Sequence, residues 1–369
     1  MIQSNKIESM IGRYDMTAIP KYKILAETLR SDIVCGVYQN GDTLPSENEL
    51  AEKYRLSRHT VRQAISQLEA ESLIVRVRGS GTYVSYRKNR APRTMTVGVI
   101  TTYISDYIFP TILSGIEKTL SEKGYSMNLS ATRNRTENEK RILHEYLEKP
   151  IDGLIVEGTK SALPNPNIAL YEKLGASGVP IVFINSYYRE LDAPISVLME
   201  DREGGRQAVR YLIDRGYRNI GGIFKSDDMQ GAERYAGYSR ALTDADLPIH
   251  DEAVVWYTTE SRQMILEQTE EIIMERLCGC DAVLCYNDEV AAKLIDILAR
   301  RKISVPDGMA VMSFDDSGIA KFVVPPLTSL LHAKKEMGAI AAKKLLQMMA
   351  GKKESPVLLP WKISIRKST

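Results

Sequence analysis

The chain has 369 residues, 44% of them hydrophobic and 26% charged, with a formal net charge of +2 at pH 7. This composition is ordinary for a folded globular protein and excludes a disordered chain, and the length predicts two or three compact domains. No apolar run approaches the roughly 18 residues that span a bilayer, and the N-terminus lacks the apolar core of a signal peptide. We therefore expect a cytoplasmic protein with no membrane partner.

The charge is unevenly distributed along the chain. Residues 1–93 hold 15 Lys and Arg against 10 Asp and Glu, whereas the rest of the chain holds 34 against 37. A basic N-terminal part joined to a mildly acidic remainder favours a nucleic-acid contact near the N-terminus.

The first predicted helices follow an N-terminal extension, residues 1–18, that shows no clear periodicity. From Lys21 to Cys35 apolar residues recur at helical spacing, and Gly36 ends that helix. Ser46 and Glu49 fit a capping box, which predicts that a second helix begins at about Ser46.

A third helix begins after Ser57, a residue type that favours the N-cap position. Its apolar stripe has the i, i+3, i+4, i+7 spacing of a helix face that packs on a core. The stripe consists of Val61, Ala64, Ile65 and Leu68. It turns polar and basic side chains toward solvent, namely Arg58, His59, Arg62, Gln63 and Ser66. Polar donors near the N-terminal end of such a helix are what reading of the DNA major groove requires.

A β-hairpin follows, with residues 73–78 and 82–84 as strands around the turn Gly79-Ser80-Gly81. Three helices and a hairpin make a winged helix-turn-helix domain, which we place at residues 19–84. The hairpin carries Arg76 and Arg78 beside glycines that let the backbone approach phosphate closely. Residues 85–95 form a basic linker, either a solvated tether or a segment that orders against DNA.

From Thr94 onward, β-rich apolar runs alternate with amphipathic helices. One series extends from Val97–Thr101 to Val179–Asn185, and a second opens at Ser196–Met199 and ends at Met309–Ser313. Near-continuous Val and Ile runs between helices indicate parallel sheets covered on both faces. We predict an α/β body over residues 96–365 with two such sheets, and a ligand cleft at the carboxyl ends of their strands.

These motifs resemble two known families. The segments 44–47 and 57–64 and the wing at 79–84 resemble GntR-type winged helix domains. The body resembles the LacI/GalR regulators and periplasmic sugar-binding proteins. The matching motifs are Ile151–Val156, Gly204-Gly205, Arg234–Tyr238, Cys285–Glu289, Ser313–Asp316 and Pro325–Ser329. Segments 101–110 and 157–163 are similar to the L-arabinose-responsive repressors of Gram-positive bacteria.

The resemblance implies two lobes, between which the chain crosses three times. We place the crossings near Tyr188–Ser196, Asp315–Gly318 and Leu330–Lys335, and expect residues after about Pro356 to rejoin the second lobe.

The resemblance also implies an operator-facing surface on the N-terminal domain. Arg58 is our first candidate for a bidentate contact with guanine, and the other interpretation of this surface is a solvated helix face. Lys21, Lys23 and Arg78 are expected to contact phosphate, together with the wing glycines Gly79 and Gly81. The remaining predicted contacts are Glu47, Asn48, Ser57, His59, Thr60 and Arg62.

For the body, the resemblance implies a sugar site between the lobes. Sugar hydroxyls need paired donors and acceptors together with an aromatic face. The predicted effector contacts are Tyr103, Asp106, Tyr107, Phe109, Glu157, Lys160, Arg234, Asn287, Asp315 and His332. Alternatives stay open for several of them: Tyr103 and Phe109 as core aromatics, Glu157 and Lys160 as partners of one another, and Asp316 as a turn cap.

The function implied is a homodimeric transcriptional repressor that leaves its operator when a sugar, L-arabinose first, binds between the lobes. Another pentose or hexose effector, or an activator or corepressed regulator of the same architecture, is the alternative. An enzyme is disfavoured because Gly79-Ser80-Gly81 lies between strands and no nucleotide loop, metal cluster or catalytic triad is found. We predict no cofactor and no metal, since no histidine stands near Cys278, Cys280 or Cys285, and Cys35 is isolated. A transport receptor is disfavoured by the missing export signal.

Overall fold

The computed structural model describes residues 20–34, 36–39, 41–71, 73–77, 80–84, 93–105, 108–265 and 270–369. The chain divides into two units, Met1–Pro92 and Arg93–Thr369, which we call the head and the body. The predicted extension 1–18 and residues 85–92 of the predicted linker lie outside the described residues. Within the described ranges, no helix is both long and apolar enough to cross a membrane.

The described residues of the head form three helices and a two-stranded antiparallel wing. These are α2 (Lys21–Val34), α3 (Glu47–Tyr54), α4 (Arg58–Ala70), β1 (Ile74–Val77) and β2 (Gly81–Val84). The predicted capping box is present, because Ser46 Oγ accepts from Glu49 N at 3.3 Å and Glu49 Oε2 accepts from Ser46 N at 2.7 Å. The predicted stripe of α4 is buried against α2 and α3, which fixes the polar face of α4 toward solvent.

The first lobe of the body is a six-stranded parallel sheet with the order β13-β7-β6-β5-β3-β4. Its strands are β3 (Thr96–Thr101), β4 (Ser126–Ala131), β5 (Gly153–Glu157), β6 (Ile181–Ile184), β7 (Ile195–Met199) and β13 (Val357–Leu359). Alternate strand residues face opposite sides, so the sheet has two apolar faces. One face is covered by α5 (Phe109–Ser121) and α13 (Lys334–Met349), the other by α6 (Thr136–Glu148) and α7 (Ile168–Ala176).

The second lobe repeats this plan with the strand order β14-β12-β11-β10-β8-β9, in which β14 is antiparallel to β12. Its strands are β8 (Ile220–Lys225), β9 (Val254–Tyr257), β10 (Ala282–Cys285), β11 (Ala310–Asp315), β12 (Thr328–Leu331) and β14 (Lys362–Ser364). One face is covered by α8 (Asp201–Asp214) and α9 (Met229–Asp244). The other is covered by α10 (Glu270–Arg276), α11 (Asp288–Arg300) and α12 (Gly318–Phe322), and a short 3₁₀ turn, η1 (Asp251–Ala253), precedes β9.

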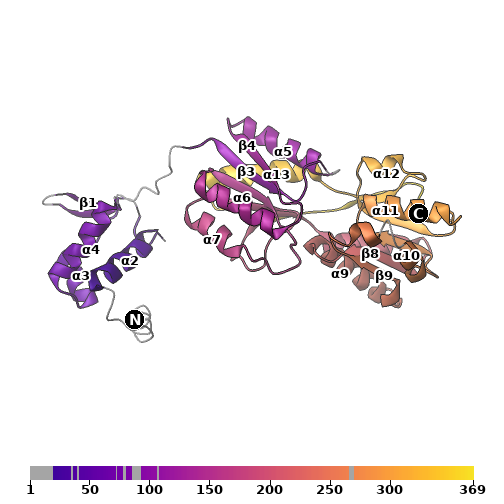
Figure 1. Ribbon diagram of the computed structural model, residues 1–369, viewed down its shortest axis with the longest axis horizontal. Helices are drawn as coiled ribbons and strands as arrows, with labels where there is room; N and C mark the ends of the chain where they lie inside the picture. Colours follow the sequence, from indigo (N-terminus) through magenta and orange to yellow (C-terminus); the bar gives the residue numbers. More distant parts are fainter. Residues whose placement is uncertain are drawn as a thin grey trace. The chain divides into compact units, whose positions relative to one another are not determined.

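Each lobe joins a pair of helices through glycines. In the first lobe, a Cβ at Gly338 would lie 2.1 Å from the backbone oxygen of Ile112, so α13 and α5 touch backbone to backbone. Figure 1 shows these two helices side by side although they come from opposite ends of the body sequence. In the second lobe, a Cβ at Gly237 would lie 1.9 Å from the backbone oxygen of Arg202, which brings α9 equally close to α8. Only glycine permits these approaches.

Of the three predicted crossings between the lobes, one is present in the structure and two are wrong. Ile195–Met199 pairs with β6 in the first sheet and does not open the second, so the first crossing lies at Glu200. No crossing occurs at Asp315–Gly318, because β11 and β12 pair within one sheet. The second crossing lies between Leu331 and Lys334, as predicted, and the third between Leu359 and Lys362. One residue separates β7 from α8, and two residues separate β13 from β14. With elements so close together in the chain, their spacing did not show which sheet β7 joins.

The body also extends beyond the predicted limits of 96–365 at both ends. The amides of Thr94 and Met95 donate to the Asp152 carboxylate at 2.9 and 3.0 Å. Near the C-terminus, Ser368 is fully buried, and its Oγ accepts a hydrogen bond from Thr328 N at 2.8 Å. These polar contacts leave no hydrophobic periodicity, which is why the sequence pattern placed the ends too far inward.

Candidate functional site

The head presents a polar groove on α4. Tyr22, His59, Arg62, Gln63 and Ser66 line it. Arg62 Nη2 lies 3.0 Å from Glu47 Oε2, and Arg76 Nη2 donates to Ser66 Oγ at 3.1 Å. The charge of these basic side chains is partly balanced by Glu47 on α3 and by Glu69 on α4, which lies 3.3 Å from Arg76 Nε.

The structure places most of the predicted operator contacts on exposed surface of the head. Lys21 and Lys23 stand in the first turn of α2, Asn48 in the first turn of α3, and Arg58 and His59 at the start of α4. Ser57 serves as the N-cap of α4, its Oγ accepting from Thr60 N at 3.1 Å. Gly81 has a φ of 139°, a conformation that favours glycine. Arg78 and Gly79 lie outside the described residues.

The body holds a pocket between its lobes. Seven of the predicted effector contacts line it: Tyr103, Phe109, Glu157, Arg234, Asn287, Asp315 and His332. Asp106 and Tyr107 lie outside the described residues. The pocket is formed at the carboxyl ends of β5, β8, β10 and β11 and at the crossings, as parallel α/β sheets dictate.

Arg234 is the most constrained side chain of the pocket. It is 4% exposed, and its Nε donates to Asp201 Oδ1 at 2.8 Å while Nη2 lies 3.6 Å from Asp315 Oδ1. Its Cζ lies 4.3 Å from the ring centroid of Phe314 and 5.3 Å from that of Trp361. Burial disfavours the charged guanidinium, but Asp201 and Asp315 outweigh it and raise the pKa of Arg234. The group is a fixed cation clamped between two carboxylates and aromatic faces.

A chain of hydrogen bonds links Glu157 of the first lobe to His332 at the second crossing. Thr102 N donates to Glu157 Oε2 at 2.9 Å, and Asn185 Nδ2 donates to Glu157 Oε1 at 2.8 Å. Burial raises the pKa of Glu157. Burial also lowers the pKa of His332 to about 3, so its ring is neutral. Its Nε2 lies 3.2 Å from Asn185 Oδ1 and must donate there, which leaves Nδ1 as an acceptor with no hydrogen-bond partner among the described residues.

The other cations that line the pocket are also paired with carboxylates. Lys225 Nζ contacts Asp227 Oδ1 at 3.3 Å and Asp228 Oδ2 at 2.5 Å, and Arg262 lies 2.7 Å from Glu289 Oε2. The carboxylates Glu157, Asp201, Asp228, Glu289 and Asp315 outnumber the cations Lys225, Arg234 and Arg262 on the pocket wall. Such a wall offers hydrogen bonds to neutral hydroxyls and repels an added negative charge.

Two predicted effector contacts play other parts in the structure. Lys160 does not line the pocket, and it pairs with Glu260 of the second lobe at 2.5 Å instead of with Glu157. Asn287 lines the pocket, but its Oδ1 also caps α11 by accepting from Val290 N at 3.0 Å. Asp316 lies away from the pocket wall and pairs with Arg366 at 2.6 Å.

Several pocket residues were missed from the sequence. Asp201 was missed because the strand before it was assigned to the wrong lobe, and Asn185 because it ends a run that was read only as a strand. Lys225 is the last residue of β8 and Asp228 follows this strand, and their position at the end of a buried strand was the signal that could have found them. The others are Thr102, Ile108, Met199, Gln230, Tyr257, Arg262, Tyr286 and Glu289.

Comparisons with known proteins agree with this arrangement. Residues 21–84 match the model of the bacterial regulatory proteins of the gntR family, and residues 209–369 match a periplasmic binding protein-like domain. The arabinose metabolism transcriptional repressor of Geobacillus stearothermophilus is 41% identical over 90% of this chain and 92% of its own length. The repressor of the same name from Halalkalibacterium halodurans is 37% identical over 95% of this chain and 96% of its own.

The chain belongs to the family of arabinose metabolism transcriptional repressors. It is a DNA-binding transcriptional regulator that joins a GntR-type head to a LacI-type sugar-binding body. The relatives named above are regulators of transcription. The family, the fold class and the regulatory function that were predicted from the sequence are thereby confirmed.

Solved structures support the same fold. The complex of transcriptional regulator CelR with cellobiose has a TM-score of 0.67 and 25% identity, covering 85% of this chain and 90% of that one. The transcription regulator CcpA of Lactococcus lactis has a TM-score of 0.66 and 26% identity, covering 75% of this chain and 100% of that one.

Proposed function

We propose that this protein represses genes of sugar use by binding operator DNA through its head, and that a neutral pentose in the body pocket releases it. L-arabinose is the first candidate effector, because the relatives similar over nine-tenths of the chain are named for arabinose metabolism. The observation that carries the proposal is the pocket wall, in which each named cation already has a carboxylate partner. A neutral polyol fits that wall, whereas a sugar phosphate or sugar acid would add an uncompensated charge.

The effector test is calorimetry on the full chain. We expect binding of L-arabinose, weaker binding of D-xylose, D-ribose and D-galactose, and none of L-arabinonate, the anionic control. Arg234→Lys keeps the charge but loses the planar fork that spans Asp201 and the Tyr286 carbonyl, so we expect binding to be lost. Binding of L-arabinonate as tight as that of L-arabinose would contradict the pocket assignment.

For the head, residues 19–84, we propose that Arg58 reads a base and that Lys21, Lys23 and Arg78 contact phosphate. The exposed α4 face and its groove support this assignment. Arg62 forms an ion pair with Glu47 in the structure, and on DNA binding it would leave Glu47 and contact the DNA. Arg58→Ala should weaken operator binding by about 1–3 kcal/mol and relax the preference at one base pair. If Arg58→Ala binds the operator with wild-type affinity and prefers it over scrambled DNA as strongly as the wild type does, the assignment of Arg58 is wrong.

We further propose that the protein acts in the cytoplasm as a homodimer, with the two heads on half-sites about one helical turn, or multiples of it, apart. Phe322 and Val324, 86% and 83% exposed at the end of α12, are apolar side chains that a second copy could cover. Analytical ultracentrifugation of the wild type and of Phe322→Ser tests this: a monomeric wild type would contradict the proposal. An effector that strengthens operator binding would instead favour a corepressed regulator.

A further inference from the structure

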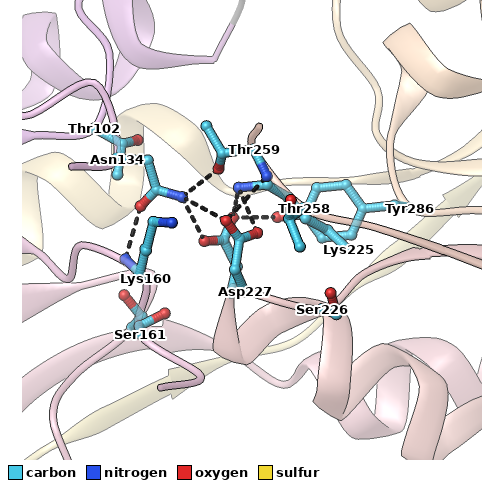
Figure 2. A network of polar contacts seen from close by, with 12 residues as sticks. Thr102, Asn134, Lys160, Ser161, Lys225, Ser226, Asp227, Thr258, Thr259 and Tyr286 are labelled. Atoms are coloured by element: carbon cyan, nitrogen blue, oxygen red, sulfur yellow. Dashed lines mark hydrogen bonds and ion pairs between the residues drawn. The ribbon is translucent and has the colours of Figure 1, made fainter. Parts of the chain in front are cut away.

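The two lobes are joined by a polar network that is centred on Asn134 and lies mostly outside the pocket wall. Asn134 follows β4 in the first lobe, and its Nδ2 donates to Thr259 Oγ1 at 2.6 Å and to Asp228 Oδ1 at 3.2 Å in the second lobe. The same nitrogen lies 3.4 Å from Asp227 Oδ2, while Asn134 Oδ1 accepts from Lys160 N at 2.7 Å. Figure 2 shows Asn134 between Lys160 on one side and Asp227 and Thr259 on the other.

Further contacts cross between the same loops. Met229 N, in the first turn of α9, donates to Ser161 Oγ at 3.0 Å, and Ala162 N donates to the backbone oxygen of Asp227 at 3.3 Å. The ion pair of Lys160 with Glu260 spans the lobes at 2.5 Å. We call these residues, Asn134, Lys160, Ser161 and Ala162 of the first lobe and Asp227, Asp228, Met229, Thr259 and Glu260 of the second, the clasp. Of the clasp only Asp228 lines the pocket.

The first-lobe half of the clasp is held in place from behind. Asn134 is fully buried with a φ of 54°, a left-handed conformation that Asn tolerates better than most residues. The backbone N–H of Asn134 donates to Thr132 Oγ1 at 3.2 Å, and Thr159 Oγ1 donates to the same oxygen at 3.0 Å. Thr159 N donates to Tyr188 OH at 2.6 Å, and Tyr188 donates in turn to the buried Glu139 carboxylate. These hydrogen bonds hold the side-chain amide of Asn134 in the orientation in which it contacts the second lobe.

The second-lobe half is equally fixed. Thr259 N donates to Asp227 Oδ2 at 3.0 Å, and Lys225 contacts both Asp227 and Asp228. In the clasp, the side-chain amide of Asn134 therefore faces the carboxylates of Asp227 and Asp228, and the Lys225 ammonium partly balances the charge of both. Separation of the lobes would break the contacts between the two halves of the clasp at once and leave Asn134, Asp227 and Thr259 to water.

We propose that the clasp sets the balance between closed and open lobes, and thereby sets effector affinity and release from DNA through residues of which all but Asp228 lie outside the pocket wall. The inference rests on the sugar binding proposed above, because a ligand enclosed by both lobes enters and leaves only when they part. A chain that is closed for a larger fraction of the time binds more tightly, since the apparent Kd scales inversely with the competent fraction. The clasp acts on that fraction.

Asn134→Asp is the sharpest test. The substitution keeps the side-chain shape, the tolerance of the left-handed backbone and the oxygen that accepts from Lys160 N. It replaces the donor nitrogen by a second acceptor within 3.4 Å of Asp227 and Asp228, so that like charges meet across the lobes. We expect an L-arabinose Kd raised about tenfold or more, from a lower closed fraction.

The double variant Asn134→Asp with Asp227→Asn replaces one of the two carboxylates near position 134 by an amide, while Asp228 stays in place. We expect it to recover part of the lost affinity. Arg141→Ala is the matched control, because its ion pair with Glu145 is exposed like that of Lys160 with Glu260 but lies within one helix. Lys160→Ala should raise the Kd by less than Asn134→Asp, and Arg141→Ala should leave it unchanged.

Hydrogen–deuterium exchange of the full chain measures the opening of the clasp independently of sugar affinity. The amides of Ala162 and Met229 donate across the lobes, so peptides covering them should exchange faster in Asn134→Asp than in the wild type. Added L-arabinose should restore their protection.

Two results would overturn the proposal. If the wild type binds L-arabinose and Asn134→Asp binds it equally well, the clasp does not set affinity. If the wild type binds none of the sugars, the proposed effector is wrong, and unchanged exchange at Ala162 and Met229 in the variant would reject the clasp as well. Faster exchange with an unchanged Kd would reduce the network to a structural role and reject the proposal.

Discussion

Replacement of Arg234 by Met removes the cation of the pocket and keeps most of its length and apolar contact. The side chain is 4% exposed and lies between Asp201 and Asp315, which are 7% and 3% exposed. Loss of one partner of a buried ion pair leaves the other charge uncompensated, which costs about 3–5 kcal/mol in comparable sites. We expect a loss of this size in the free energy of unfolding at pH 7.5, and loss of sugar binding.

The pH dependence separates this account from a simple packing defect. Burial raises the pKa of Asp201 to about 6 even with Arg234 present, and without the guanidinium it should rise further. A carboxyl with a raised pKa contributes stability that is present at low pH and is lost as pH rises through the folded-state value. Protonation of Asp201 near pH 5 should therefore remove part of the deficit, so that the variant loses less stability at pH 5 than at pH 7.5.

Urea unfolding followed by tryptophan fluorescence measures the effect, because one of the two tryptophans, Trp361, lies 5.3 Å from the Arg234 guanidinium. Arg141→Met is the control, since its ion pair with Glu145 is exposed and should be worth no more than about 0.5 kcal/mol. The double variant with Asp201→Asn should regain part of the loss. A deficit under about 1 kcal/mol at pH 7.5, or one of equal size at both pH values, would refute the reasoning.

Other regions give further tests. His332 is neutral in the folded chain with a pKa of about 3 against an ordinary 6.5, so its contribution to stability is lost as pH falls below 6.5. His332→Gln should therefore lose about 2 kcal/mol less stability than the wild type between pH 6.5 and pH 5 in urea titrations, and parallel curves would contradict this. Lys23→Ala should weaken binding of all DNA sequences alike and flatten its salt dependence, whereas a sequence-dependent loss would show that Lys23 reads bases. Gly237→Ala places a Cβ 1.9 Å from the Arg202 oxygen and should destabilise the body by about 1–3 kcal/mol, which an unchanged melting temperature would exclude.

The sequence predicted the elements better than it predicted their partners. The capping box at Ser46, the N-cap at Ser57 and the stripe of α4 follow from local spacing and are present in the structure. The strand Ile195–Met199 was predicted as a strand but placed in the wrong sheet. Its apolar pattern fits either lobe, and the pairing with β6 and β13 is decided by segments far away in the chain.

The pocket shows the same limit. The family resemblance gave four of its lining residues, Arg234, Asn287, Asp315 and His332, and the ends of the predicted strands gave three more, Tyr103, Phe109 and Glu157. Asp201, the closest carboxylate partner of Arg234, carries no motif, and only the fold brings α8 beside α9. Lys160 was expected to face the sugar, but its partner Glu260 lies 100 positions away in the second lobe. Asn134 has no signal in the sequence beyond the tolerance of Asn for a left-handed backbone.

The coupling between the pocket and the head is tested most directly by a titration of the full chain bound to a fluorescent operator fragment. Anisotropy is followed while L-arabinose is added, with L-arabinonate as the anionic control. The account predicts that saturating L-arabinose lowers operator affinity by about 5- to 150-fold, the range of an allosteric coupling of 1–3 kcal/mol, and that L-arabinonate leaves the affinity unchanged. An operator affinity that stays the same at saturating L-arabinose, in a chain shown by calorimetry to bind it, would contradict the account.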